Sequence, residues 1–297
     1  QGVRVFPNAR TLKVIQNKAR QKLFYRDNAI PTAPFSRFGY TSEIKDSIEN
    51  GGLSFPFVWK SAQFGYDGQG VKIVRKYDDL EGLPNVECVA EELIPFKNEL
   101  AVIVARNTSG QTRTYPVVEM EFHPEANQVE YVLCPARIPE HVADKARKVA
   151  LMVSESLGHV GLLAVELFQT QEDEILVNEV APRPHNSGHY SIEGSFTNQF
   201  EQHLRSILGL PLGKTDSKVS AVMVNLVGAE GFEGPVHYKG IEDILGLPAV
   251  TPHIYGKKMT RPFRKMGHVT IVDPSIEKAR EMAARVKERI EVVSNKT

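Results

Sequence analysis

The segment that most constrains the fold is an apolar run that ends in a dense set of polar side chains. Residues 175–177 (Ile-Leu-Val) have the character of a buried strand, and residues 178–190 follow with an amide, a carboxylate, an arginine and two histidines. Two prolines and a glycine restrict the path of this loop. Such a strand delivers hard oxygen ligands and anion-binding groups to one place. A plain polar surface loop is the alternative, but functional groups concentrate on rigidly placed loops, so the pattern favours a functional site.

Composition narrows the class of protein. The 297 residues are enough for about two domains. The formal net charge is zero and the sequence pI is about 7.3, which argues against a nucleic acid or an acidic membrane surface as partner. Cys88 and Cys134 are far apart and lack metal-ligand spacing, so we expect a reduced, cytoplasmic chain. No apolar run approaches the roughly 20 residues that a membrane helix needs.

The periodicity predicts mixed helices and strands. Helices are expected over 9–28, 42–50, 139–157, 198–208 and from 273 to about 292. Strands are expected over 55–60, 71–75, 87–94, 99–106, 114–122, 129–135, 161–168, 174–179 and 220–227. Because these elements lack strict βαβ alternation, the fold class is α+β rather than a doubly wound sheet.

A lysine and a glycine-rich turn form the first candidate site. Lys60 ends a strand, and the segment Gly65, Tyr66, Asp67, Gly68, Gln69, Gly70 leads into the returning strand. Backbone N–H groups approach phosphate oxygens closely where no Cβ intervenes, and the ammonium adds a point charge. A simple β-hairpin is the alternative, because Asp67-Gly68 is also a good turn signal. The lysine and the glycines favour a phosphate-covering lid.

Two further candidates involve carboxylates. The strand end at Glu91, Glu92, Leu93 and Ile94, with Glu99 after it, offers backbone groups to a purine edge and carboxylates to ribose hydroxyls, although glutamates there are more often simply solvated. Glu166 lies in an otherwise apolar strand, and Asn178 and Glu179 follow the next strand. A hairpin would place Glu166 and Glu179 side by side, where they repel unless a cation lies between them. Mg²⁺ bound together with nucleotide phosphates fits this pair.

The last candidate is a basic segment near the C-terminus. Five basic residues lie within nine positions of an otherwise neutral chain: Lys257, Lys258, Arg261, Arg264 and Lys265. Such a cluster suits a sugar phosphate, although charge runs often only face water. His268, just beyond it, is by itself compatible with a structural role.

Taken together, these motifs resemble the ATP-grasp superfamily and, within it, the N5-carboxyaminoimidazole ribonucleotide synthases. The resemblance rests on residues 16–18, 65–70, 91–99, 178–189 and 264–268 and covers nearly the whole chain in order. The string Ala-Pro-Arg-Pro-His-Asn-Ser-Gly-His at 181–189 is highly specific to this family, whereas the glycine loop is shared more widely.

The resemblance implies a set of site residues. ATP contacts are implied at Lys18, Lys60, Gly65, Tyr66, Asp67, Gly68, Gln69, Gly70, Glu91, Glu92, Leu93, Ile94, Glu99, His123, Asn178 and Glu179, and Mg²⁺ ligation at Glu166 and Glu179. The ribonucleotide and the bicarbonate-derived group are implied to lie among Tyr66, Asp67, Arg183, His185, Asn186, Ser187, Lys257 and Arg264. Catalytic roles fall to Lys60, Tyr66, Asp67 and Arg183.

The chain departs from the family pattern at two positions. Gln69 stands where members often carry Arg or Lys, which removes one anion contact of the loop. The first motif contains Asn17-Lys18 where Arg is common at the second position, so the charge is kept but the bidentate geometry is lost.

The resemblance also implies an organisation. A connector would span 1–22, two ATP-grasp lobes that clamp ATP would span 23–95 and 96–211, and a small β-rich domain with a closing helix would span 212–297. The family's Rossmann-like N-terminal domain is expected to be absent from this chain.

The implied activity is ATP- and bicarbonate-dependent carboxylation of 5-aminoimidazole ribonucleotide through carboxyphosphate, in purine biosynthesis. A homodimer and a downstream mutase as pathway partner are implied with it. Two alternatives stay open at this point: another ATP-grasp ligase of purine synthesis, of the glycinamide ribonucleotide or formate-dependent type, and a non-catalytic ATP-binding fragment.

Overall fold

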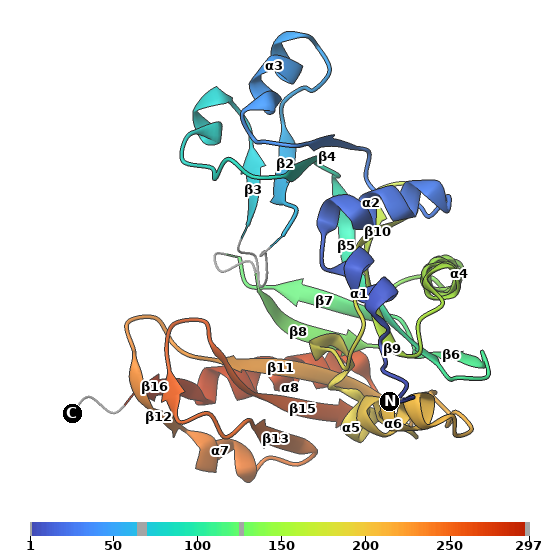
Figure 1. Ribbon diagram of the computed structural model, residues 1–297. Coiled ribbons are helices and arrows are strands. Elements are labelled where there is room, and N and C mark those ends of the chain that lie inside the picture. Colours follow the sequence, from blue (N-terminus) through green and yellow to red (C-terminus); the bar gives the residue numbers. More distant parts are fainter. Residues whose placement is uncertain (1, 64–69, 125–127, 295–297) are drawn as a thin grey trace.

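The computed structural model describes residues 2–63, 70–124 and 128–294. Figure 1 shows a small lobe standing above a larger body. The small lobe is built on a four-stranded sheet of order β1-β4-β2-β3, and Phe57 and Trp59 on β2 are buried in its own core. Its elements are β1 (Phe35–Phe38), α3 (Glu43–Glu49), β2 (Phe57–Ser61), β3 (Val71–Val74), the 3-10 helix η1 (Tyr77–Leu80) and β4 (Cys88–Glu92).

The larger body is organised by one antiparallel sheet of nine strands. Its order is β10-β9-β5-β7-β8-β11-β15-β13, with β6 paired to β5. The strands are β5 (Phe96–Arg106), β6 (Thr112–Thr114), β7 (Val118–Phe122), β8 (Val129–Cys134), β9 (Gly161–Thr170), β10 (Ile175–Ala181), β11 (Ser220–Val227), β13 (Val250–Ile254) and β15 (Lys265–Asp273). Because β8 pairs with β11, the C-terminal part continues the same sheet.

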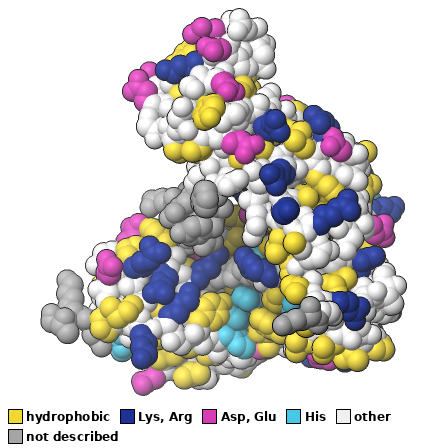
Figure 2. All heavy atoms as spheres, in the orientation of Figure 1, with side chains coloured by type: hydrophobic (Ala, Val, Ile, Leu, Met, Phe, Trp, Pro, Cys, Tyr) yellow, Lys and Arg dark blue, Asp and Glu magenta, His cyan; other side chains and the backbone are white. Residues whose placement is uncertain are grey.

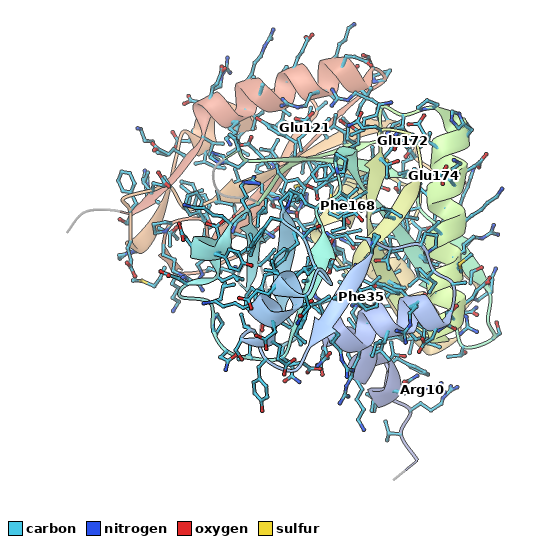
Figure 3. The ribbon with its side chains drawn as sticks, turned by 90° about the horizontal axis from the view of Figure 1, so that it is seen from above. Arg10, Phe35, Glu121, Phe168, Glu172 and Glu174 are labelled. Carbon is cyan, nitrogen blue, oxygen red and sulfur yellow. The ribbon has the colours of Figure 1, made fainter. Side chains whose placement is uncertain are left out.

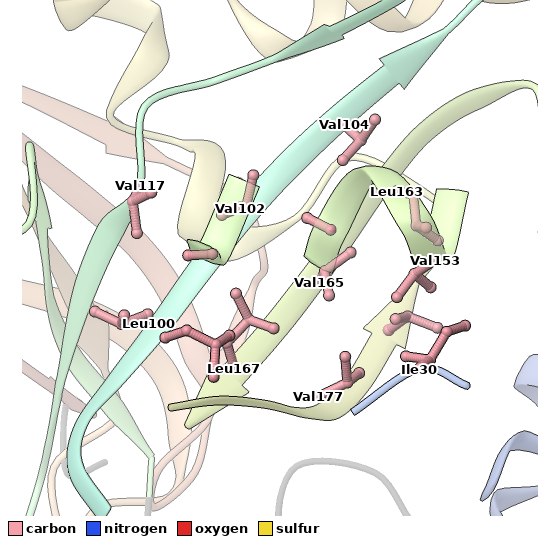
Figure 4. Packing of buried hydrophobic residues seen from close by; sticks show 14 of the residues in the cluster. Ile30, Leu100, Val102, Val104, Val117, Val153, Leu163, Val165, Leu167 and Val177 are labelled. Carbon is pink, nitrogen blue, oxygen red and sulfur yellow. The ribbon is translucent and has the colours of Figure 1, made fainter. Parts of the chain in front are cut away.

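The main core lies between the first half of this sheet and helix α4 (Glu140–Leu157). Figure 4 shows Val102 and Val104 of β5 packed with Leu163 and Val165 of β9. These residues alternate along their strands, so the apolar side chains share one face of the sheet. Gly158 ends α4 in the left-handed conformation, with φ 58°, as the sequence predicts.

A second core supports the C-terminal part. Helix α8 (Ile276–Arg289) packs on β11 and β15 through Ala279, Ala283 and Val286. In Figure 3, α8 and α4 run along different sides of the body. The remaining elements are α1 (Ala9–Ile15), α2 (Lys18–Asp27), η2 (Asn186–Gly188), α5 (Ser191–Gly194), α6 (Gln199–Leu208), α7 (Ile241–Leu245) and the sheet of β14 (Met259–Thr260), β12 (Gly234–Lys239) and β16 (Glu291–Ser294). Within the described ranges, no helix has the length and apolar character needed to cross a membrane.

Three predicted elements differ from the structure. The helix predicted over 9–28 is two helices, because the Asn17 side chain accepts a hydrogen bond from the N–H of Arg20 and caps α2. The strand predicted over 114–122 is interrupted at residues 115–117, where Pro116 cannot donate to a ladder. The closing helix begins at Ile276, after the N-cap Ser275, rather than at 273, and it ends at Arg289 rather than near Val292 because residues 291–294 pair with β12.

Candidate active site

Two carboxylates lie opposite each other on neighbouring strands of the large sheet. Glu166 of β9 and Glu179 of β10 are partners in the strand register, next to a bulge that follows Val177. The predicted side-by-side placement is therefore confirmed. Burial, and then the charges of Glu179 and Glu99, raise the pKa of Glu166 to about 8. This crowding of acidic oxygens is what a divalent cation would relieve.

Lys18 carries a positive charge beside this pair. Its Nζ lies 2.7 Å from Oε2 of Glu179, whose side chain is 46% exposed. Burial raises the pKa of Glu179, but Lys18, together with Lys60 and His185, outweighs burial and the net shift is downward. Over the described residues, no group of three or more His, Cys, Asp or Glu side chains could hold a metal. The protein thus offers two carboxylates, and nucleotide phosphates would have to complete the shell of a bound Mg²⁺.

Lys60 lies at the junction of the two lobes. Its Nζ donates to Oε2 of Glu91 and to Oδ1 of Asn178, each at 3.0 Å. The Glu91 carboxylate is 3% exposed and also contacts Lys22 at 2.9 Å. The expectation that this carboxylate takes a ribose hydroxyl is wrong for Glu91, because its side chain is turned into the interior, where both ammonium groups stabilise it.

The chain between the lobes carries the other predicted nucleotide contacts. β4 ends at Glu92, whose side chain is exposed, and Leu93 and Ile94 connect it to β5 as irregular, half-buried backbone. Glu99 follows on β5, where burial raises its pKa to about 7 and the charge of Lys60 acts in the opposite direction. These residues stay predicted ATP contacts.

The polar loop after β10 is held by Gln199, a residue that the sequence analysis missed. The Gln199 side chain accepts from the N–H of His185 and donates to its carbonyl and to Nδ1 of His189, at 2.8–2.9 Å. The N–H and hydroxyl of Ser187 lie at Nδ1 of His185, which makes that nitrogen an acceptor. The Nε2–H of a neutral His185 therefore faces Oε1 of Glu166, 3.4 Å away. Burial, and then the charge of Arg183, lowers the pKa of His185 to about 4.

Other residues of this loop differ in exposure. Ser187 is buried, so it supports His185 from behind, whereas Arg183 is exposed and donates to the carbonyl of Pro184 at 3.0 Å. Asn186 exchanges two amide hydrogen bonds, of 2.8 and 3.0 Å, with Asn225 of β11. The loop is thus fixed to the C-terminal part of the sheet.

Four rings form a stacked column between this loop and the C-terminal strands. Phe200, His189, His268 and His253 follow one another with centroid separations of 5.9, 4.7 and 4.4 Å and interplanar angles of 15–17°. Nε2 of His253 lies 2.9 Å from Oε1 of Glu193, and Nδ1 of His268 lies 3.0 Å from the Tyr255 hydroxyl. Burial, together with the neighbouring histidines, lowers the pKa of His189 to about 4 and that of His268 to about 2.

The basic segment begins at the end of this column. Nζ of Lys257 donates to the carbonyl of Lys265 at 2.6 Å, and Arg264 donates to the carbonyl of Met259 at 2.8 Å. Figure 2 shows Lys and Arg side chains gathered on the face below the small lobe, with histidines among them and a notch in the surface between lobe and body. This arrangement suits the predicted anion site.

Two other predictions have different outcomes. His123 follows β7 and packs edge-on against Phe263, with ring centroids 6.4 Å apart. Gly65, Tyr66, Asp67, Gly68 and Gln69 lie outside the described residues, whereas Gly70 accepts from the N–H of Ser61 at 2.9 Å. Lys22, Gln199 and Asn225 were missed; only Lys22 carried a signal, because it lies one helical turn after Lys18.

Comparison with known families agrees with this geometry. Residues 23–200 match the ATP-grasp domain, and residues 221–282 match the phosphoribosylaminoimidazole carboxylase C-terminal domain. The two-lobed fold and its paired carboxylates therefore define an ATP-grasp protein.

The similar proteins narrow the family further. The chain is 38% identical to the N5-carboxyaminoimidazole ribonucleotide synthase of Bacillus subtilis over 88% of this chain and 67% of that protein. The crystal structure of the synthetase from Thermotoga maritima is 44% identical, with a TM-score of 0.88 over 99% of this chain and 77% of that one. The Aspergillus clavatus synthase, solved with ADP and 5-aminoimidazole ribonucleotide, is 30% identical, with a TM-score of 0.86 over 97% of this chain and 77% of that one. The chain belongs to the N5-carboxyaminoimidazole ribonucleotide synthase family.

Proposed function

We propose that this chain catalyses the ATP- and bicarbonate-dependent carboxylation of 5-aminoimidazole ribonucleotide to N5-carboxyaminoimidazole ribonucleotide, in purine biosynthesis. The observation that carries the proposal is the opposed pair Glu166 and Glu179, flanked by Lys18 on one side and by His185 on the other. Two carboxylates beside lysines suit a metal–nucleotide complex, and the family membership points to this reaction.

Mg-ATP would occupy the junction of the two lobes. Glu166 and Glu179 would hold Mg²⁺, which when bound neutralises charge on the phosphate oxygens. Lys18 and Lys60 would add point charges beside it. The backbone between Glu91 and Ile94 would meet the base, since it connects the lobes in irregular conformation.

The chemistry we propose has three steps. A bicarbonate oxygen attacks the γ-phosphorus as its bond to ADP breaks, which gives carboxyphosphate. The bond between the carboxyl carbon and the bridging oxygen then breaks, which releases CO₂ and a phosphate that keeps this oxygen. Finally the exocyclic amine of the ribonucleotide bonds to the CO₂ carbon and loses a proton. Lys60 and Arg183 would stabilise the charge that develops on the phosphoryl group.

The ribonucleotide would bind between the polar loop and the basic segment. Lys257 and Arg264 would take its phosphate, and His185 with Asn186 would face its base and the carboxyl group. Tyr66 and Asp67, which lie outside the described residues, stay our candidates for closing the site and for accepting the amine proton.

We also propose that the enzyme is cytoplasmic and works as a homodimer, with a mutase downstream. Support for association comes from helix α6, where Phe200, Leu204 and Leu208 are spaced four residues apart and are 43–66% exposed. Light scattering coupled to size-exclusion chromatography tests this point: a dimer mass that Leu204→Glu converts to monomer is the expected result, and a monomer at all concentrations would contradict it.

The function is tested by phosphate release from Mg-ATP and bicarbonate, measured with and without 5-aminoimidazole ribonucleotide. We expect strong stimulation by the ribonucleotide. Release stimulated instead by glycine or formate would point to another ATP-grasp ligase. Binding of ATP without any release would point to a binding module.

A further inference from the structure

One carboxylate at the lobe junction is shared by two buried lysines. Oε2 of Glu91 lies 2.9 Å from Nζ of Lys22 and 3.0 Å from Nζ of Lys60. The three side chains are 3%, 2% and 11% exposed, in that order. They come from three elements, β4, α2 and β2, so the cluster forms only in the folded protein.

The charges in this cluster do not balance. Two ammonium groups face one carboxylate, and Lys60 also donates to the neutral amide of Asn178. Glu99 lies within reach of the charge of Lys60, but its raised pKa of about 7 leaves that carboxyl only partly charged near neutral pH. The nearby carboxylate of Glu179 is paired with Lys18 at 2.7 Å. A surplus positive charge is therefore held in a site where water is scarce, which is costly unless an anion joins it.

Lys22 does not reach the surface. Its Nζ also donates to Oγ1 of Thr32 at 2.6 Å, and that hydroxyl donates to the carbonyl of Val177 on β10 at 2.7 Å. In Figure 1, α2 lies beside β10 and below the small lobe. Because Lys22 is 2% exposed, it can act on a ligand only through Glu91 and Lys60.

We propose that Lys22 is a positioning residue for nucleotide binding: it occupies part of the Glu91 carboxylate and so leaves positive charge on Lys60 available to the nucleotide phosphates. The inference rests on the proposed binding of ATP at this junction. Without Lys22, the Glu91 carboxylate would neutralise Lys60 fully, and the surplus charge would be lost.

A charge-balance series tests this role in the full chain. The variants are Lys22→Met, Glu91→Gln and the double variant, with Lys45→Met on the small-lobe surface as a matched control. Affinity for a non-hydrolysable ATP analogue is measured by calorimetry, and the melting temperature is measured beside it. Lys22→Met should weaken binding by about tenfold or more, the effect of one hydrogen bond to a charged group.

The double variant gives the decisive result. It restores one surplus charge, so it should bind the analogue several times more tightly than Lys22→Met even if both variants melt earlier than the wild type. Binding by the double variant that is as weak as, or weaker than, that of Lys22→Met would overturn the inference and leave Lys22 a purely structural role. No binding of the analogue by the wild type would overturn the proposed function as well.

A pH titration of the wild type covers the case in which a variant does not fold. Burial lowers the pKa of Lys22 to about 8, while Glu91 opposes this shift and Lys60 and Lys18 add to it. Affinity for the analogue should therefore fall as the pH rises past about 8, and Lys22→Arg should keep its affinity through that range. A wild-type affinity that stays constant across that range, or parallel pH profiles for the two proteins, would contradict the inference.

Discussion

The molecule joins its parts in two different ways. At the lobe junction, Lys22, Lys60 and Glu91 form a buried cluster of charges that carries a positive surplus. At the C-terminal junction, His189, His268 and His253 form a stacked column whose buried members are kept neutral by lowered pKa values. A charged junction responds to an anionic ligand, whereas a neutral one holds its geometry whatever is bound. On the function proposed above, the first junction would recognise the nucleotide and the second would support the polar loop.

The largest effect on activity is expected when a carboxylate of the Glu166–Glu179 pair is removed. Glu179→Gln should lower phosphate release by about a thousandfold or more, because charge stabilisation by a bound metal is worth several kcal/mol. Glu172→Gln, at the exposed turn of the same hairpin, is the matched control. Near-normal turnover of Glu179→Gln would remove the basis for the metal site.

Removing a ring from the column should act on stability instead. His268→Ala should lower the free energy of unfolding by about 2–4 kcal/mol, since it leaves a cavity between His189 and His253. His268→Phe keeps the ring and should lose less than half as much. Urea denaturation measures both, and equal losses would show that stacking is not what the column contributes.

The column should also make the stability of the fold depend on pH. The pKa values of His189 and His268 in the folded protein lie below the ordinary value of about 6.5. At pH values between the folded and the ordinary pKa, the unfolded chain therefore binds more protons than the folded one. Stability is then complete above pH 6.5 and falls as the pH drops toward 4 and below. The double variant His189→Phe/His268→Phe should show a flatter profile between pH 6.5 and 4, and an unchanged slope would argue against the column as its source.

An exposed ion pair provides the smallest expected effect. Lys145 lies 2.8 Å from Glu174, and the two side chains are 43% and 65% exposed. Lys145→Ala should change the free energy of unfolding by no more than about 0.5 kcal/mol, because water and salt screen such pairs. A loss of stability as large as that of His268→Ala would contradict the claim that exposed contacts contribute less than buried ones.

Some of this architecture was predictable from the sequence and some was not. The pairing of Glu166 with Glu179 followed from two strands and a short turn, which fix the register locally. The burial of Lys22 did not follow, because the spacing of Lys18 and Lys22 along one helix gives no sign of a carboxylate that is distant in the sequence. Strand β16 was missed for the same reason, since its partner β12 is more than 50 residues away. Gln199 and Asn225 act through contacts that no local pattern records.

The most direct test of the proposed reaction traces the carbon atom of bicarbonate into the product. ¹³C-bicarbonate, Mg-ATP and 5-aminoimidazole ribonucleotide are mixed with the enzyme, and carbon NMR is recorded while phosphate is counted. We expect a new carbamate resonance whose amount equals the amount of phosphate released. Phosphate release with no labelled carbamate, or with a rate indifferent to the ribonucleotide, would contradict it.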